Sequence, residues 1–357
     1  MDLPAAGSSM ASTRRTWIAR VLLVVMSVLI GALVGELSLR ALGFPYRMVE
    51  FVPSGVPGHF LMKPNQDFLQ PWEDPPTRMH INSLGLRGDD IDPDGCWTIL
   101  ALGDSFTFEG GFVTKLHDQL NERFGAGIEV VNAGYGGATI DREAVVFEKQ
   151  GVLVKPDVVI LQFFPNDIEA LLEGKQPERV YQQLEFPFKP LLRQTATYQL
   201  LFRLRLTASR RNAGSAYENT ESGVPYLLFR TKQFYGEPLP ARLQRAWERY
   251  FEHLGTLIER IRREGIRLMM LVIPDVYQFS SPNLNPLPQQ LISRFVGKWH
   301  VPVVDVLPVF QSAETEALTL YRDPESDGHL TPRGDSVVAS ALLDALTELN
   351  WVHACDS

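Results

Sequence analysis

The 357-residue sequence has only two cysteines, Cys96 and Cys355, which lie far apart and form no Cys-x-x-Cys pair. Neither a cysteine zinc site nor a dithiol redox motif is therefore supported. The two thiols can form one disulfide if the chain is exported, or can stay unpaired, and the sequence leaves both possibilities open. The histidines outside one motif described below form no metal-ligand cluster, so we predict no metal site and no cofactor.

The sequence also lacks an excess of positive charge. Its formal net charge is −8 and its pI is near 5.5. A general nucleic-acid-binding protein would show a basic total or a basic face, so no nucleic-acid partner is predicted. With 45% hydrophobic and 21% charged residues, the composition is that of a globular protein with ample core, in one large or two small domains.

There is a single long apolar run. Residues 17–36 are nearly all apolar, long enough to cross a bilayer as a helix, and preceded by Arg14 and Arg15. The positive-inside rule places residues 1–16 in the cytoplasm and the rest of the chain outside the cytoplasmic membrane, on the periplasmic side. No convincing small-x-small cleavage site follows the run, so we expect an uncleaved, single-pass anchor.

The remainder divides into an irregular part and a regular part. Residues 37–95 are rich in proline and glycine and are expected to form an irregular stalk, in which residues 80–90 (HINSLGLRGDD) have the pattern of a short strand followed by turns. From Trp97 onward, short apolar runs alternate with amphipathic stretches, which predicts βαβ units and a parallel sheet. Strands are expected at 97–102, 128–134, 157–164, 267–274 and 301–306, and helices at 112–124, 139–154, 243–263 and 332–349.

Four loops of this α/β pattern carry polar residues suited to catalysis. Ser105 lies in a Gly-Asp-Ser turn after the first strand, Asn132 to Gly137 follow the second, and Pro165 to Asp167 follow the third. Asp327 and His329 precede the last helix. In open α/β sheets the ligand crevice lies beyond the carboxyl ends of the strands, so a hydroxyl there faces substrate rather than core.

Nucleophilic acyl transfer needs a hydroxyl, a base that takes its proton, an acid that orients the base, and donors for the oxyanion. The four loops supply all of these groups. A glycine allows backbone amides to approach a substrate oxygen, and an asparagine side chain offers uncharged N–H donors. Any one of these motifs alone is an ordinary turn or helix cap, so their combination is what indicates a site.

The segments GDSFTFEGG, NAGYGG, FPND and DGHLTPRG, in that order, resemble the motif blocks of the SGNH or GDSL hydrolase superfamily over about residues 97–350. The resemblance implies a flavodoxin-like three-layer αβα sandwich at about 96–350, preceded here by one transmembrane helix. It implies that Ser105 is the nucleophile, His329 the general base and Asp327 the orienting acid. It also implies an oxyanion hole made by the amides of Ser105 and Gly137 and by the side chain of Asn166.

Two departures from the family pattern leave alternatives. The acid of many members stands three positions before the histidine, where this chain has Ser326; we favour Asp327, an offset that resembles the exopolysaccharide-acetylating branch, over Glu325 and Asp323. The amides of Gly134 and Gly136 are alternatives to that of Gly137, which the spacing from Asn132 favours.

The predicted function is a serine esterase that acts on acyl esters through an acyl-enzyme. An envelope polysaccharide O-acetyltransferase or deacetylase would use the same site, and a catalytically inactive member would only bind glycans. Residues 170–240 form an insertion rich in aromatic residues, too long for a simple connection. Such a surface suits an acylated glycan or a lipid, although an accessory helical pair with its own core fits equally well.

Overall fold

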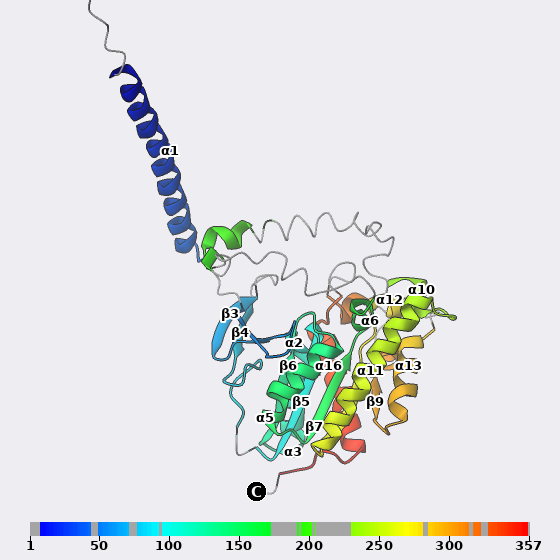
Figure 1. The fold of residues 1–357 in the computed structure, drawn as a ribbon. Coiled ribbons are helices and arrows are strands. Elements are labelled where there is room, and N and C mark those ends of the chain that lie inside the picture. Colours follow the sequence, from blue (N-terminus) through cyan, green and yellow to red (C-terminus); the bar gives the residue numbers. More distant parts are fainter. Residues whose placement is uncertain are drawn as a thin grey trace, which may run out of the picture. The chain divides into compact units, whose positions relative to one another are not determined.

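A computed structural model describes most of the chain (Figure 1). The chain divides into two compact units: one contains residues 1–48, 68–77 and 186–209, and the other contains the rest. The described residues are 8–43, 49–70, 77–92, 95–172, 191–192, 194–201, 204, 230–280, 285–313, 317–322 and 328–355.

The first unit is built on one long helix. Helix α1 spans Ser8–Ala41, and its stretch Trp17–Ala41 is long and apolar enough to cross a membrane, with none of the apolar window buried in the protein. A helix that is apolar all round needs apolar surroundings, which the protein itself does not supply here. Near its carboxyl end, Glu36 accepts hydrogen bonds from the amides of Ala196 and Thr197 at 2.9 and 3.0 Å.

The second unit contains the predicted parallel sheet. The strand order is β6-β5-β7-β8-β9, and all neighbouring pairs are parallel. This is the doubly wound, flavodoxin-like order. Its switch point lies between the neighbouring strands β5 and β7, because the chain continues from β5 toward one edge of the sheet and from β7 toward the other. The strands are β5 Trp97–Gly103, β6 Ile128–Gly134, β7 Val158–Phe163, β8 Arg267–Val272 and β9 Val303–Asp305.

Helices cover both faces of the sheet and so complete three layers. On one face α3 packs against α16, and on the other α11 packs against α4, as right-handed crossovers require. The buried residues of α11, among them Leu243, Trp247, Tyr250, Leu254 and Leu257, recur at helical spacing along one face. The helices are α2 Ser105–Glu109, α3 Gly111–Phe124, α4 Ile140–Val146, the π-helical turn η1 Phe147–Gly151, α5 Val152–Val154, α6 Asn166–Ala170, α10 Lys232–Tyr235, α11 Ala241–Arg263, α12 Val276–Ser280, α13 Leu287–Gly297, α14 Leu307–Ala313, α15 Ala317–Leu320 and α16 Pro332–Glu348.

The stalk is more regular than its composition indicates. It contains the strands β1 Phe51–Pro53, β2 Phe60–Met62, β3 Gln66–Gln70 and β4 Thr77–Ile81, of which β1 and β2 pair antiparallel. Strands of three to five residues are too short to show a clear alternation of apolar and polar residues. Most of the insertion at 170–240 lies outside the described residues.

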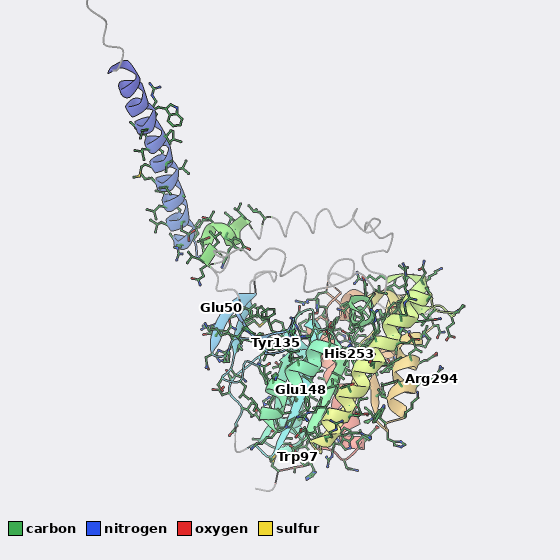
Figure 2. The ribbon with its side chains drawn as sticks, viewed as in Figure 1. Glu50, Trp97, Tyr135, Glu148, His253 and Arg294 are labelled. Carbon is green, nitrogen blue, oxygen red and sulfur yellow. A yellow bond between two sulfur atoms is a disulfide. The ribbon has the colours of Figure 1, made fainter. Side chains whose placement is uncertain are left out.

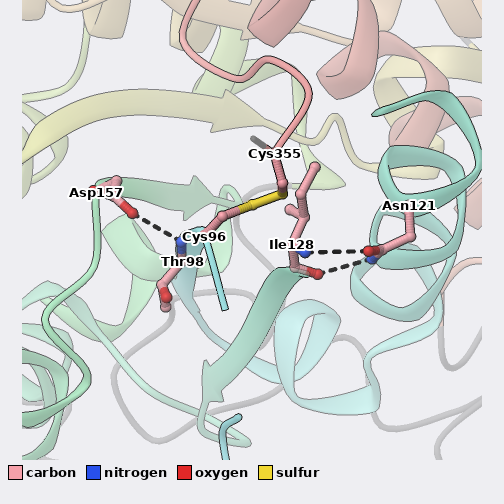
Figure 3. Close-up of a disulfide and its surroundings, with 6 residues drawn as sticks. All are labelled: Cys96, Thr98, Asn121, Ile128, Asp157 and Cys355. Atoms are coloured by element: carbon pink, nitrogen blue, oxygen red, sulfur yellow. Dashed lines mark hydrogen bonds between the residues drawn. A yellow bond between two sulfur atoms is a disulfide. The ribbon is translucent and has the colours of Figure 1, made fainter. Parts of the chain in front are cut away.

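The two cysteines form a disulfide (Figure 3). Cys96, just before β5, is bonded to Cys355 near the end of the chain, 259 residues later. Of the two possibilities that the sequence leaves open, the structure has the bonded one. Close by, the Thr98 amide donates to Asp157 at 2.9 Å and anchors the start of the same strand.

Candidate active site

Ser105 begins helix α2 directly after strand β5. The carboxylate of Asp104 caps this helix by accepting from the Phe106 amide at 3.0 Å. A Cβ at Gly103 would lie 2.3 Å from Thr107 Oγ1 and 2.4 Å from Gln162 Oε1, so only glycine fits there. The serine at this turn is therefore placed at the carboxyl edge of the sheet, beside the switch point between β5 and β7.

His329 contacts the Ser105 hydroxyl. Its Nε2 lies 2.8 Å from Ser105 Oγ, although the two residues are 224 positions apart in the sequence. The histidine loop is fixed by backbone bonds: the Arg322 amide donates to the His329 carbonyl at 2.6 Å, and Tyr321 forms an antiparallel bridge with Leu330. The ring also packs on Phe106, with 4.7 Å between ring centroids. The structure thus places these two candidate residues in hydrogen-bonding contact.

The first turn of α16 fixes the other side of the histidine loop. Thr331 is the N-cap of the helix and accepts from the Gly334 amide at 3.1 Å, with Pro332 in the first turn. This is the cap that the Thr-Pro sequence predicts.

Asn166 follows strand β7 and faces the turn that carries Ser105. Its Nδ2 donates to the carboxylate of Asp104 at 3.0 Å. Burial raises the pKa of Asp104, and the bonds from Phe106 and Asn166 together with the charge of His329 oppose that rise. Its neighbour Asp167 is buried, and burial raises its pKa well above the usual range.

The end of β6 and the loop that follows it contain two different kinds of glycine. A Cβ at Gly134 would lie 2.3 Å from the Phe108 nitrogen, so this glycine is needed for the close packing of β6 against α2. Gly136 and Gly137 are exposed, a Cβ would meet nothing at either, and Gly137 has a φ of 68°. Packing thus accounts for Gly134 but not for the two exposed glycines.

An acidic and a basic residue that the sequence analysis did not single out lie beside His329. Glu109, at the end of α2, has an oxygen 3.7 Å from His329 Nε2 and forms an ion pair with Arg322. Asp335 in α16 lies close to both charges, and burial raises its pKa to about 6. Glu109 stands inside the GDSFTFEGG segment, so its position four residues after the serine is the signal that could have identified it.

Asp327, the predicted orienting acid, lies outside the described residues, as do Glu325 and Asp323. Gly137 and Asn166 follow the strands on either side of β5, at the edge where Ser105 lies. Among the described residues, no group of three or more histidine, cysteine, aspartate or glutamate side chains is arranged to hold a metal ion.

A parallel αβα sheet with a serine–histidine pair at its switch point is an arrangement typical of enzymes that cleave esters. The model of the GDSL-like lipase/acylhydrolase family matches residues 101–337. The chain belongs to this family and is a hydrolase that acts on ester bonds. The match includes the serine, asparagine and histidine motifs but not the stalk or α1.

Solved structures of similar fold are distant in sequence. An α/β hydrolase from the metagenome of Lake Arreo, Spain, is 16% identical, with a TM-score of 0.45 over 72% of this chain and 97% of that one. A catalytic mutant of an acetylxylan esterase from Geobacillus stearothermophilus is 16% identical, with a TM-score of 0.42 over 73% and 99%. A lipase/acylhydrolase from Enterococcus faecalis is 14% identical, with a TM-score of 0.41 over 71% and 96%. No curated protein matches.

Proposed function

We propose that the protein is a membrane-anchored serine esterase in which Ser105 is the nucleophile and His329 the general base. The observation that carries the proposal is the 2.8 Å contact between Ser105 Oγ and His329 Nε2. This is the distance over which a base removes the hydroxyl proton as the oxygen attacks.

The reaction follows from these two positions. Ser105 Oγ bonds to the ester carbonyl carbon, its proton moves to His329 Nε2, and the carbonyl oxygen becomes an oxyanion. Collapse of this intermediate breaks the bond to the alkoxy oxygen, which takes the proton from His329 and leaves as an alcohol. Water then repeats the sequence on the acyl-enzyme and releases the acid.

The oxyanion is assigned to the amides of Ser105 and Gly137 and to Asn166 Nδ2. Support comes from the exposure of Gly137, from its lack of a packing role, and from the bond that orients Asn166 through Asp104. Preorganised donors of this kind cost no reorganisation when the charge develops.

Asp327 is the proposed acid that orients His329. Since Nε2 faces the serine, an orienting carboxylate must act on Nδ1, on the opposite side of the imidazole ring. Comparison of Asp327→Asn with Asp323→Asn and Glu325→Gln tests the choice. The Asp327 variant should lose most of the kcat, and a larger loss in either of the others would reassign the acid.

The anchor is proposed to stay on the mature protein, with the catalytic unit on the periplasmic side of the cytoplasmic membrane. The bonds that Glu36 accepts from Ala196 and Thr197 join α1 to a segment 160 residues later in the chain, which a cleaved signal sequence would not need. The Cys96–Cys355 disulfide fits an oxidising compartment. The substrate is accordingly sought among acyl esters of the cell envelope, on glycans or lipids.

The decisive experiment uses a fluorophosphonate probe and p-nitrophenyl acetate with the full-length chain. The wild type should form an adduct at Ser105 and release p-nitrophenol; Ser105→Ala should do neither, and His329→Ala should label far more slowly. Ser312→Ala is the matched control, because Ser312 is exposed on α14. Folded wild-type protein that forms no adduct at Ser105 would identify a glycan-binding protein instead. Product analysis with a glycan acceptor then separates hydrolysis from acyl transfer.

A further inference from the structure

The segment Asn82–Asp90 (NSLGLRGDD) has no part in the mechanism above, yet it is built into the edge of the sheet. Arg87 forms antiparallel bridges with both Ile81 and Asn132, and its amide donates to the Asn132 carbonyl at 3.1 Å. Asn132 belongs to β6, just before the exposed glycines. This part of the stalk therefore continues the sheet beside the strand that carries the glycine loop.

The side chain of Arg87 reaches the far end of the nucleophile helix. Its Nη1 donates to the Phe108 carbonyl in α2, and its guanidinium carbon lies 5.6 Å from the centroid of the Phe108 ring. Asn132 Nδ2 donates to the preceding carbonyl, that of Thr107, at 2.6 Å. The last carbonyls of a helix have no hydrogen-bond donor within the helix. Arg87 and Asn132 supply such donors to two of these carbonyls in α2.

Gly110 makes this approach possible. It ends α2 in the left-handed conformation, with a φ of 75°. A Cβ there would lie 2.7 Å from both Arg87 Nη1 and Asn132 Nδ2. The glycine of the GDSFTFEGG segment thus provides both the turn and the space for the two donors.

Both ends of α2 are consequently held by side chains from elsewhere. At the start, Asp104 caps the helix and is bonded by Asn166. At the other end, Arg87 and Asn132 bond the carbonyls of Phe108 and Thr107. Because the helix has only five residues, a tilt at its carboxyl end moves Ser105 directly.

The same segment is also connected to the glycine loop. The Leu84 carbonyl accepts from Gln150 Nε2 at 2.8 Å, and Gln150 Oε1 accepts from the Tyr135 hydroxyl at 2.9 Å. A Cβ at Gly85 would lie 2.3 Å from Gln150 Nε2, so the contact needs a glycine. Tyr135 directly precedes Gly136. Figure 2 shows Tyr135 and Trp97 toward opposite ends of the unit.

We propose that the NSLGLRGDD segment positions the active site, and that Arg87 is a positioning residue that holds α2, and with it Ser105, in register with His329. The inference rests on the proposed function in that Ser105 is taken as the nucleophile. It assigns to the stalk a role in the chemical step, carried by a residue that touches no substrate.

The test compares Arg87→Gln and Arg87→Lys with Arg78→Gln in the full-length chain. Arg78 lies on β4 in the same part of the stalk and forms an exposed ion pair with Asp67, so it controls for loss of a cation. The readouts are kcat and KM for p-nitrophenyl acetate, the rate of fluorophosphonate labelling, and the urea unfolding midpoint. A displacement of about 1 Å can cost on the order of 100-fold in rate.

We expect Arg87→Gln to lower kcat and the labelling rate by about 30- to 100-fold with KM within twofold. A lysine keeps a single cationic donor without the planar fork, so Arg87→Lys should lose about three- to tenfold. Arg78→Gln should stay within twofold. Folded Arg87→Gln protein that labels at the wild-type rate would overturn the inference.

If Arg87→Gln does not fold, Arg87→Lys decides. A reduced kcat at unchanged KM supports the positioning role, and a wild-type kcat overturns it. Failure of the proposed function is distinguishable, because the wild type itself would then form no adduct at Ser105.

Discussion

Removal of the Cys96–Cys355 disulfide should destabilise the protein mainly through its unfolded state. The bond closes a loop of 259 residues. In the chain-entropy model, a closure of this length removes about 19 cal/mol/K from the unfolded chain, or about 5.6 kcal/mol at 25 °C as an upper limit. Removal of native disulfides typically costs about 2–5 kcal/mol, so we expect a loss in that range for the double variant Cys96→Ser/Cys355→Ser.

Contacts in the folded state explain why loss of the disulfide should act mainly on the unfolded chain. The end of the chain keeps other contacts when the disulfide is absent: the Trp97 and His353 rings meet edge to face at 4.7 Å, and Arg267 donates to the Trp351 carbonyl at 3.0 Å. The native geometry around Cys355 is therefore held without the covalent bond, and most of the difference falls on the freedom of the unfolded chain.

The assay is urea unfolding of the full-length chain in detergent, followed by tryptophan fluorescence with and without dithiothreitol. The reductant should lower the midpoint of the wild type to that of the double variant and leave the double variant unchanged. A wild-type midpoint that does not respond to full reduction, with loss of the bond verified by mass, would refute the loop-closure reasoning.

Two further predictions concern the site. Burial and the charge of Glu109 raise the pKa of Asp335 from 3.8 to about 6. Between these two pH values the folded protein therefore binds more protons than the unfolded chain. The free energy of unfolding should accordingly fall by up to about 3 kcal/mol as the pH rises from about 4 to above 6. In Asp335→Asn this fall should be absent from urea midpoints measured across the range, and an identical pH profile in the variant would contradict the assignment. Asn166→Ala should lower kcat for p-nitrophenyl acetate by about 100- to 1,000-fold through loss of an oxyanion donor. A kcat within threefold of the wild type would remove Asn166 from the oxyanion hole. The same variant also takes from Asp104 the hydrogen bond that Asn166 donates to it, which should lower the free energy of unfolding in urea by about 1–3 kcal/mol.

The parts of the fold that sequence patterns predicted are those with strong local signals. The five β-strands of the sheet are short apolar runs, and α11 carries its buried residues at helical spacing, so each element is encoded within its own segment. The helix predicted at 139–154 is present as α4, η1 and α5, but its π-helical turn was not predicted. That turn contains Gln150, whose contacts with Leu84 and Tyr135 come from elsewhere in the chain.

The candidate site shows the same division. The resemblance of four short motifs selects Ser105 and His329 as candidates, and the structure brings these two together at 2.8 Å. Glu109, Arg322 and Arg87 were not identified, because an acidic or basic side chain in a loop is usually solvated and its neighbours cannot be inferred from spacing. In the structure, Arg87 bonds the Phe108 carbonyl.

By itself, the sequence determined the alternation of strands and helices, the apolar N-terminal helix, and the four motifs with their order, because all of these depend on residues close together in the chain. Only the tertiary structure decided that Cys96 is bonded to Cys355, that Glu36 accepts from the amides of Ala196 and Thr197, and that Arg87 bonds the last turn of α2. Such contacts join groups tens to hundreds of residues apart, and no local propensity or periodicity encodes which distant partner each will meet once the sheet has formed.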